Sequence, residues 1–208
     1  MDQAFIKERL LPLNPINEIT ESDLDEDKAL LNYLIASGKD PNLEFQQAGV
    51  LLPLVRNCNN DHWDIILTRR ALHLKHHPGE ISFPGGRFEP QDKDLETTAK
   101  RETEEEIGIA NRYIQTIGRL PRQNTISQYQ VSPFVGIIDP DYQLSIDENE
   151  VAEAFLLPLS YALNSSNHQK VNRNINNQSV SYYLIQYNEY KIWGATARML
   201  VNFSRMLR

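Results

Sequence analysis

Three glutamates on one side of a predicted helix are the residues of this sequence best suited to chemistry. Glu102, Glu105 and Glu106 lie in segment 94–107, whose residues 95, 99, 103 and 107 form a stripe at helical spacing. Glu102 and Glu106 fall within or beside this stripe and Glu105 lies next to it, whereas Glu104 points to the opposite side. Carboxylates so close together repel one another, so an inward-facing group is costly unless a cation neutralises it. Hard oxygen ligands of this kind indicate Mg²⁺ or Mn²⁺.

The residues that flank the glutamates decide between a metal site and an ordinary solvated acidic run. Pro84, Gly85 and Gly86 predict a tight turn that lets the backbone approach a ligand closely. Gly108 is expected to end the helix directly after residue 107. This context favours the metal site, although an isolated run of glutamates is more often a solvated helix face.

The same segment resembles the Nudix box: Gly, five residues, Glu, seven residues, then Arg-Glu-aliphatic-x-Glu-Glu-x-Gly-aliphatic. The second half of the box is matched by Arg101, Glu102, Glu105, Glu106, Gly108 and Ile109, with Thr103 in place of the aliphatic residue. The resemblance implies metal-dependent hydrolysis of a nucleoside diphosphate linked to a further group. It implies that the glutamates and the Gly86 carbonyl hold the metal, and that Arg101 braces the loop and the helix.

The first half of the box departs from the consensus. Gly86 and Arg101 are 15 positions apart, one more than in the box, so the loop between them is longer by one residue. The upstream glutamate of the box corresponds to Asp92 when counted forward from Gly86, and to Lys93 when counted back from Arg101. The sequence therefore assigns no ligand at this position.

The stretch before the box, residues 66–86, resembles the additional signature of the coenzyme A pyrophosphatase branch of the Nudix superfamily. That signature reads Leu-Leu-Thr-x-Arg-(Ser/Ala), three residues, Arg, three residues, Gly, three residues, Phe-Pro-Gly-Gly. It is matched at the required spacing by Leu67, Thr68, Arg70, Ala71, Gly79, Phe83, Pro84, Gly85 and Gly86. Lys75 replaces the second arginine, which keeps the charge but loses the bidentate fork. In all, the resemblance extends over roughly residues 48–207.

The resemblance to this branch implies a substrate and the residues that bind it. It implies cleavage of coenzyme A, or its acyl or oxidised forms, into adenosine 3′,5′-bisphosphate and 4′-phosphopantetheine or its derivative. Arg70 and Lys75 are expected to hold the 3′-phosphate or other parts peculiar to coenzyme A, and Gly85 and Gly86 to approach the substrate. Two alternatives remain: a pyrophosphatase for ADP-ribose or a dinucleotide cofactor, and a catalytically silent nucleotide-binding Nudix module. The upstream signature disfavours the first, and the complete set of helix carboxylates disfavours the second.

The base that activates water is left open by the sequence. In many Nudix enzymes a glutamate outside the box is this base. Glu150, which comes directly before the predicted strand 151–158, is a candidate for that role. Glu105 is the competing base, because a helix carboxylate not needed by the first metal could accept the proton.

The predicted elements suit an α/β (α+β) architecture. Short segments rich in Val, Ile, Leu or Tyr predict strands at 48–55, 62–69, 113–120, 130–138, 151–158 and 180–187. Helical spacing predicts helices at 22–37, 94–107 and 193–207, and the six asparagines of 164–178 predict a polar connection. We expect a mixed sheet with helices packed on it, which the family resemblance specifies as an α/β/α sandwich. The expected division is an N-terminal helical extension, 1–40, packed on a Nudix hydrolase domain, 41–208.

Composition excludes several classes of protein. The chain has 208 residues and a formal net charge of −7, which argues against nucleic-acid or anionic membrane partners. Its single cysteine, Cys58, rules out an internal disulfide and a zinc–cysteine module. No run is long and apolar enough to span a bilayer, so the default expectation is a cytoplasmic protein with a small-molecule substrate. The oligomeric state cannot be predicted.

Overall fold

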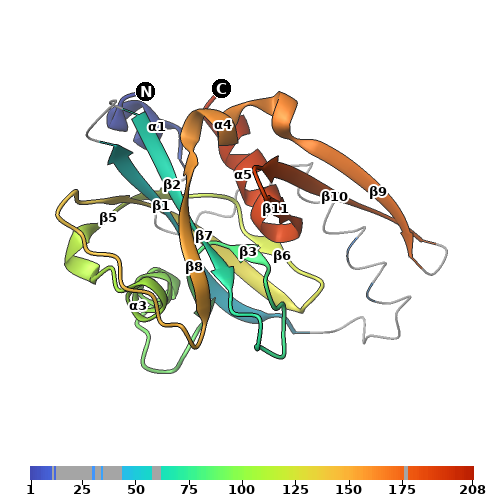
Figure 1. Ribbon diagram of the computed structural model, residues 1–208, viewed down its shortest axis with the longest axis horizontal. Coiled ribbons are helices and arrows are strands. Elements are labelled where there is room, and N and C mark those ends of the chain that lie inside the picture. The colour runs from blue at the N-terminus through green and yellow to red at the C-terminus, as the bar shows by residue number, and fades with distance from the viewer. Residues whose placement is uncertain (11, 13–29, 31–33, 35–43, 58–61, 176–177) are drawn as a thin grey trace.

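The computed structural model describes residues 1–10, 12, 30, 34, 44–57, 62–175 and 178–208 (Figure 1). Cys58 lies outside the described residues, as does the predicted helix 22–37 apart from Leu30 and Leu34. The predicted division between residues 40 and 41 also falls outside them and stays a prediction. Within the described parts of the chain, no helix is long and apolar enough to cross a membrane.

A mixed sheet forms the centre of the molecule. The order of its main strands is β8-β2-β1-β7-β5, and β1 and β7 are parallel whereas the other neighbours are antiparallel. The strands are β1 (Gln46–Asn57), β2 (His62–Arg70), β5 (Ile114–Arg119), β7 (Tyr129–Ile138) and β8 (Val151–Pro158). Each coincides with a predicted strand to within a few residues, so these predictions are confirmed.

A bent segment fills the gap where β1 and β2 separate. These two strands pair only between residues 54–57 and 62–65. Beyond that point β3 (Ile81–Ser82) pairs with β2, and β4 (Gly85–Arg87) pairs with β1. The two glycines of the predicted turn therefore lie in the sheet itself, at the place where its central strands diverge.

Helix α3 (Leu95–Ile107) covers one face of this region, and it is the helix predicted from the glutamate segment. It begins where the Asp94 carboxylate accepts the Thr97 N–H at 2.8 Å, and it ends at Gly108, whose φ is 73°. A Cβ atom at Gly49 of β1 would lie 2.2 Å from the Leu95 carbonyl oxygen. The helix therefore packs closely on β1, because Gly49 offers no side chain at the point of contact.

The opposite face carries a second layer. It consists of α5 (Gly194–Met206), the short helices α1 (Gln3–Arg9) and α4 (Leu159–Leu163), and a small sheet of β9 (Gln169–Ile175), β10 (Gln178–Tyr187) and β11 (Tyr190–Trp193). Leu52 and Leu54 of β1 belong to the same hydrophobic cluster as the buried residues of α5, whereas Leu51 and Val55 belong to the cluster that contains the buried residues of α3. Because neighbouring strand residues point to opposite faces, the sheet lies between two helical layers. The predicted α/β/α sandwich is confirmed.

The structure corrects one prediction and adds elements that were not predicted. Residues 164–178 are not simply a polar connection, because residues 169–175 pair with β10 as strand β9. The cross-strand partners, not the asparagine-rich composition, decide this structure. The elements without a prediction are short: α1, α4, β3, β4, β6 (Gln123–Asn124), β11 and the 3₁₀ helices η1 (Asn111–Tyr113) and η2 (Ser165–Asn167).

Candidate functional site

The site is built where α3 passes over the glycine pair of β4. A Cβ atom at Gly86 would lie 2.4 Å from both Cδ and Oε1 of Glu102. At Gly85, where φ is 152°, a Cβ atom would lie 2.5 Å from Cα of Val50. Glycine is therefore required at Gly86 to let a helix carboxylate rest against the backbone, and at Gly85 to let β4 approach β1.

Glu106 is the buried carboxylate of this site. Its relative exposure is 3%, and its Oε2 has no hydrogen-bond partner among the described residues. Burial, followed by the negative charge of Glu102, raises the pKa of Glu106 to about 8, although Arg70 and the Gly85 N–H oppose the shift. A buried acceptor oxygen with no partner is costly, so the environment is suited to a bound cation.

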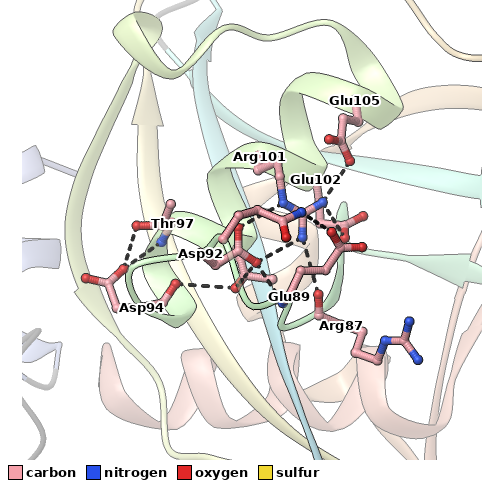
Figure 2. Close-up of polar contacts among 10 residues, drawn as sticks. Arg87, Glu89, Asp92, Asp94, Thr97, Arg101, Glu102 and Glu105 are labelled. Carbon is pink, nitrogen blue, oxygen red and sulfur yellow. Dashed lines mark hydrogen bonds and ion pairs between the residues drawn. The ribbon is translucent and has the colours of Figure 1, made fainter.

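Arg101 gathers the other two glutamates of the set, as Figure 2 shows. Its Nη1 lies 2.9 Å from Oε1 of Glu102 and 2.8 Å from Oε2 of Glu105. Its Nη2 donates to the Arg87 carbonyl at 3.3 Å, so the guanidinium also joins α3 to the end of β4. Burial raises the pKa of Glu102 despite the ion pair with Arg101. Glu105 is more open, with 57% of its side chain exposed.

Asp92 accepts two hydrogen bonds from the guanidinium of Arg101. Its carboxylate accepts from Nε and Nη2 of Arg101 at 2.9 and 3.1 Å, from the Thr98 hydroxyl at 2.9 Å and from the Glu89 N–H at 3.0 Å (Figure 2). The hydrogen bonds from Arg101 are the main reason why the pKa of Asp92 falls to about 2. Lys93, the other residue that the sequence left open, is exposed. The aspartate found by counting forward from Gly86 is therefore the partner of Arg101.

Replacing Asp92 with asparagine is expected to lower the free energy of unfolding by about 3 kcal/mol, because it leaves the guanidinium of Arg101 with a weakened partner in a buried position. Urea denaturation measures this loss. Lys93→Ala is the matched control, since the neighbouring exposed side chain is expected to contribute within about 0.5 kcal/mol. Equal stability of the Asp92 variant and the control would contradict the bracing role of Asp92.

The turn before β8 holds Glu150 next to the same carboxylates. The Asp147 N–H donates to the Glu106 carbonyl at 3.0 Å, and the Ala71 N–H donates to the Glu150 carbonyl at 2.9 Å. The charge of Glu150 contributes to the raised pKa values of both Glu102 and Glu106. These contacts join the turn to α3 and to the end of β2, with Glu150 beside the carboxylate group.

The two predicted phosphate-binding cations have different positions. Arg70 ends β2 close enough to Glu106 for its charge to lower the pKa of that carboxyl. Lys75 is exposed in the loop between β2 and β3, together with His73, His76 and His77. The structure therefore brings Arg70, and not Lys75, to the carboxylates of α3.

The residues fit a hard divalent cation in their chemistry. Within the described residues, no three acidic, histidine or cysteine side chains converge as a ready-made metal site, and Glu102 and Glu105 converge on Arg101 instead. Two observations nevertheless favour a cation: Oε2 of Glu106 is buried without a partner, and glycine at position 86 leaves room for the Glu102 carboxylate against the backbone. Carboxylate and carbonyl oxygens are the ligands that Mg²⁺ and Mn²⁺ prefer.

Comparison with known proteins decides the family. The model of the NUDIX domain matches residues 46–177. This chain belongs to the Nudix family. "Uncharacterized Nudix hydrolase NudL" of Enterobacter sp. (strain 638) is 38% identical over 158 residues, which are 76% of this chain and 81% of that protein. The protein of the same name from Escherichia coli O7:K1 is 37% identical over the same shares.

Two solved structures align with parts of this chain. A Caenorhabditis elegans Ap4A hydrolase in a binary complex aligns with a TM-score of 0.47 and 16% identity, covering 54% of this chain and 80% of the hydrolase. The NUDIX domain of Shewanella oneidensis NrtR, complexed with ADP ribose, aligns with a TM-score of 0.44 and 19% identity, covering 70% of this chain and 87% of that domain.

Proposed function

We propose that this Nudix hydrolase cleaves the pyrophosphate bond of coenzyme A or its derivatives, with Mg²⁺ or Mn²⁺, to adenosine 3′,5′-bisphosphate and 4′-phosphopantetheine or its derivative. One observation carries the proposal. The segment that resembles the coenzyme A signature, residues 66–86, forms the end of β2 and the bent β3–β4 segment. It thereby supplies Arg70 at one end and Gly85–Gly86 at the other, both next to the carboxylates of α3.

The metal would be held by Glu102, Glu105, Glu106 and the Gly86 carbonyl. A bound divalent ion would polarise the phosphoryl oxygens and lower the pKa of a coordinated water. Asp92 and Arg101 orient the carboxylates, because the guanidinium contacts both Glu102 and Glu105. The bound ion would supply locally the positive charge that a chain with a net charge of −7 otherwise lacks.

Glu150 and Glu105 are the two proposed bases. Glu150 is supported by the contribution of its negative charge to the raised pKa values of both Glu102 and Glu106. Glu105 is supported by its exposure at the rim of the carboxylate group. Either carboxylate could accept the proton of the attacking water.

The rest of the proposal concerns the setting of the enzyme. We propose that the Nudix domain extends over residues 41–208 with 1–40 as an extension packed on it. Packing of the N-terminus supports this, because Ile6 of α1 is fully buried in the core and the Met1 carbonyl accepts from the Trp63 indole at 2.9 Å. A cytoplasmic location and a small-molecule substrate complete the proposal.

Hydrolysis assays with purified protein test the function. Coenzyme A and ADP-ribose are each incubated with the enzyme, with and without Mn²⁺. We expect coenzyme A to be consumed only with the metal, and faster than ADP-ribose. Faster consumption of ADP-ribose would favour a different Nudix pyrophosphatase, and no consumption of either would favour a silent binding module.

A further inference from the structure

A buried carboxamide without its full set of hydrogen bonds lies at the first turn of α5. Gln123 of β6 is 2% exposed, and its Nε2 donates to the Ala195 carbonyl at 2.9 Å. Its Oε1 has no hydrogen-bond partner among the described residues. Gln123 is opposite Val131 of β7, which belongs to the core shared with α5, so the carboxamide lies on that face of the sheet.

The backbone beside this carboxamide is open. Trp193, which precedes α5, caps the helix with no side-chain hydrogen bond, and its own side chain is 44% exposed. A Cβ atom at Gly194, whose φ is 63°, would meet nothing within 4 Å. The first N–H groups of an α-helix have no partner within the helix. A buried acceptor without a partner, Oε1 of Gln123, therefore belongs to a carboxamide that is bonded to the first turn of α5, and the open space lies at Gly194 of the same turn.

The ligand must satisfy two kinds of group, the acceptor Oε1 of Gln123 and the donor N–H groups at the start of α5. A phosphate would suit the helix N–H groups but would be repelled by the Gln123 oxygen. A secondary amide satisfies both, because its N–H can donate to Oε1 while its carbonyl accepts from the helix. The exposed indole of Trp193 offers apolar surface for the methylene groups beside such an amide.

The first turn of α5 is linked through β3 to Gly85 and Gly86. The Thr196 hydroxyl donates to the Ile81 carbonyl of β3 at 3.0 Å, and Figure 1 shows the start of α5 beside β3 and β6. Along the chain, Ile81 is four residues from Gly85, a span of at most ~14 Å. A linear ligand that leaves the diphosphate site could therefore reach the start of α5.

We propose that Gln123 and the first turn of α5 form a subsite for the amide-bearing pantetheine arm of the substrate. The inference rests on the proposed function, because among the parts of coenzyme A only this arm carries secondary amides. The adenosine bisphosphate half of the substrate makes no use of the subsite. Gln123 is thus a determinant of specificity and takes no part in the cleavage itself.

Calorimetric titration with the two halves of the substrate tests the subsite. The wild-type enzyme and Gln123→Met, which keeps the shape but removes both amide groups, are titrated separately with 4′-phosphopantetheine and with adenosine 3′,5′-bisphosphate in the presence of Mg²⁺. The variant is expected to bind 4′-phosphopantetheine about 10-fold more weakly, the effect of one or two lost hydrogen bonds. Its affinity for adenosine 3′,5′-bisphosphate should not change, and its KM for coenzyme A should rise while kcat is kept.

Ser204→Ala is the matched control, since it removes a side-chain anchor near the other end of α5, the hydrogen bond from the Ser204 hydroxyl to the Leu163 carbonyl at 2.8 Å, and leaves the Gln123 carboxamide in place. An equal loss of 4′-phosphopantetheine binding in this variant, or an equal loss for both ligands in Gln123→Met, would overturn the subsite in favour of a structural role. Absence of 4′-phosphopantetheine binding to the wild-type enzyme would overturn it as well. The proposed function fails separately, if the wild-type enzyme with metal leaves coenzyme A intact.

Discussion

Replacement of Glu106 by glutamine is expected to lower kcat for the preferred substrate by several orders of magnitude while the fold is kept. Glutamine has nearly the same shape but lacks the negative charge that would hold a divalent ion in the buried position. Steady-state rates at saturating metal measure the effect, and circular dichroism checks the fold. Glu104→Gln is the matched control, because Glu104 lies on the exposed side of the same helix. Near-normal turnover of the Glu106 variant would contradict the metal assignment.

The same substitution should change how stability depends on pH when metal is removed by a chelator. The pKa of Glu106 is about 8 in the folded protein, against an ordinary value of 4.5 for a glutamate side chain. Between these values the folded state binds a proton that the unfolded state has lost, so stability falls as pH rises from about 4.5 to 8. The loss amounts to about 5 kcal/mol at most. We expect Glu106→Gln to flatten this part of the profile, and an unchanged slope would show that Glu106 is not the titrating group.

Arg70→Ala is expected to lower kcat/KM about 10- to 100-fold for coenzyme A and for 3′-dephospho-coenzyme A alike, the effect of one charge-assisted contact to phosphate. Because Arg70 lies beside Glu106, it is placed to hold the diphosphate, which both substrates share. Lys75→Ala should give a smaller loss, confined to coenzyme A, if the exposed lysine contacts the 3′-phosphate. The measurement is the kcat/KM of each variant relative to the wild type, determined separately for coenzyme A and for 3′-dephospho-coenzyme A.

The pattern of losses distinguishes the roles of the two cations. A loss for Arg70→Ala on coenzyme A alone would place Arg70 at the 3′-phosphate, as the sequence by itself suggested. Equal small losses of kcat/KM for Lys75→Ala on both substrates would show that Lys75 does not contact the 3′-phosphate. Circular dichroism of both variants is the check that neither change alters the fold.

Much of the fold follows from local patterns of sequence. The helix that carries the glutamates could be predicted because its helical spacing and the Gly108 terminator agree, and the strand 151–158 because it is a short segment rich in apolar residues. Strand β9 could not, because polar residues form a strand there only through pairing with β10. Such long-range pairing leaves little trace in the segment itself.

The sequence predicted which residues form the site, but it did not predict which of them contact one another. The sequence indicated the glutamates of α3, but it left Asp92 and Lys93 as equal alternatives. Only the folded loop shows that Asp92 is buried against Arg101. The forward count from Gly86 was the available signal, and the additional residue between Gly86 and Arg101 obscured it. Likewise, the separation of Arg70 from Lys75 depends on where β2 ends and the loop begins.

Identification of the products of coenzyme A turnover tests the central claim most directly. The purified enzyme is incubated with coenzyme A and Mg²⁺ or Mn²⁺, and the products are separated by chromatography and identified and quantified by mass spectrometry. Cleavage of the pyrophosphate bond predicts equal amounts of adenosine 3′,5′-bisphosphate and 4′-phosphopantetheine, and none when the metal is chelated. Intact coenzyme A after an incubation in which the same enzyme consumes ADP-ribose or another nucleoside diphosphate derivative would contradict the claim.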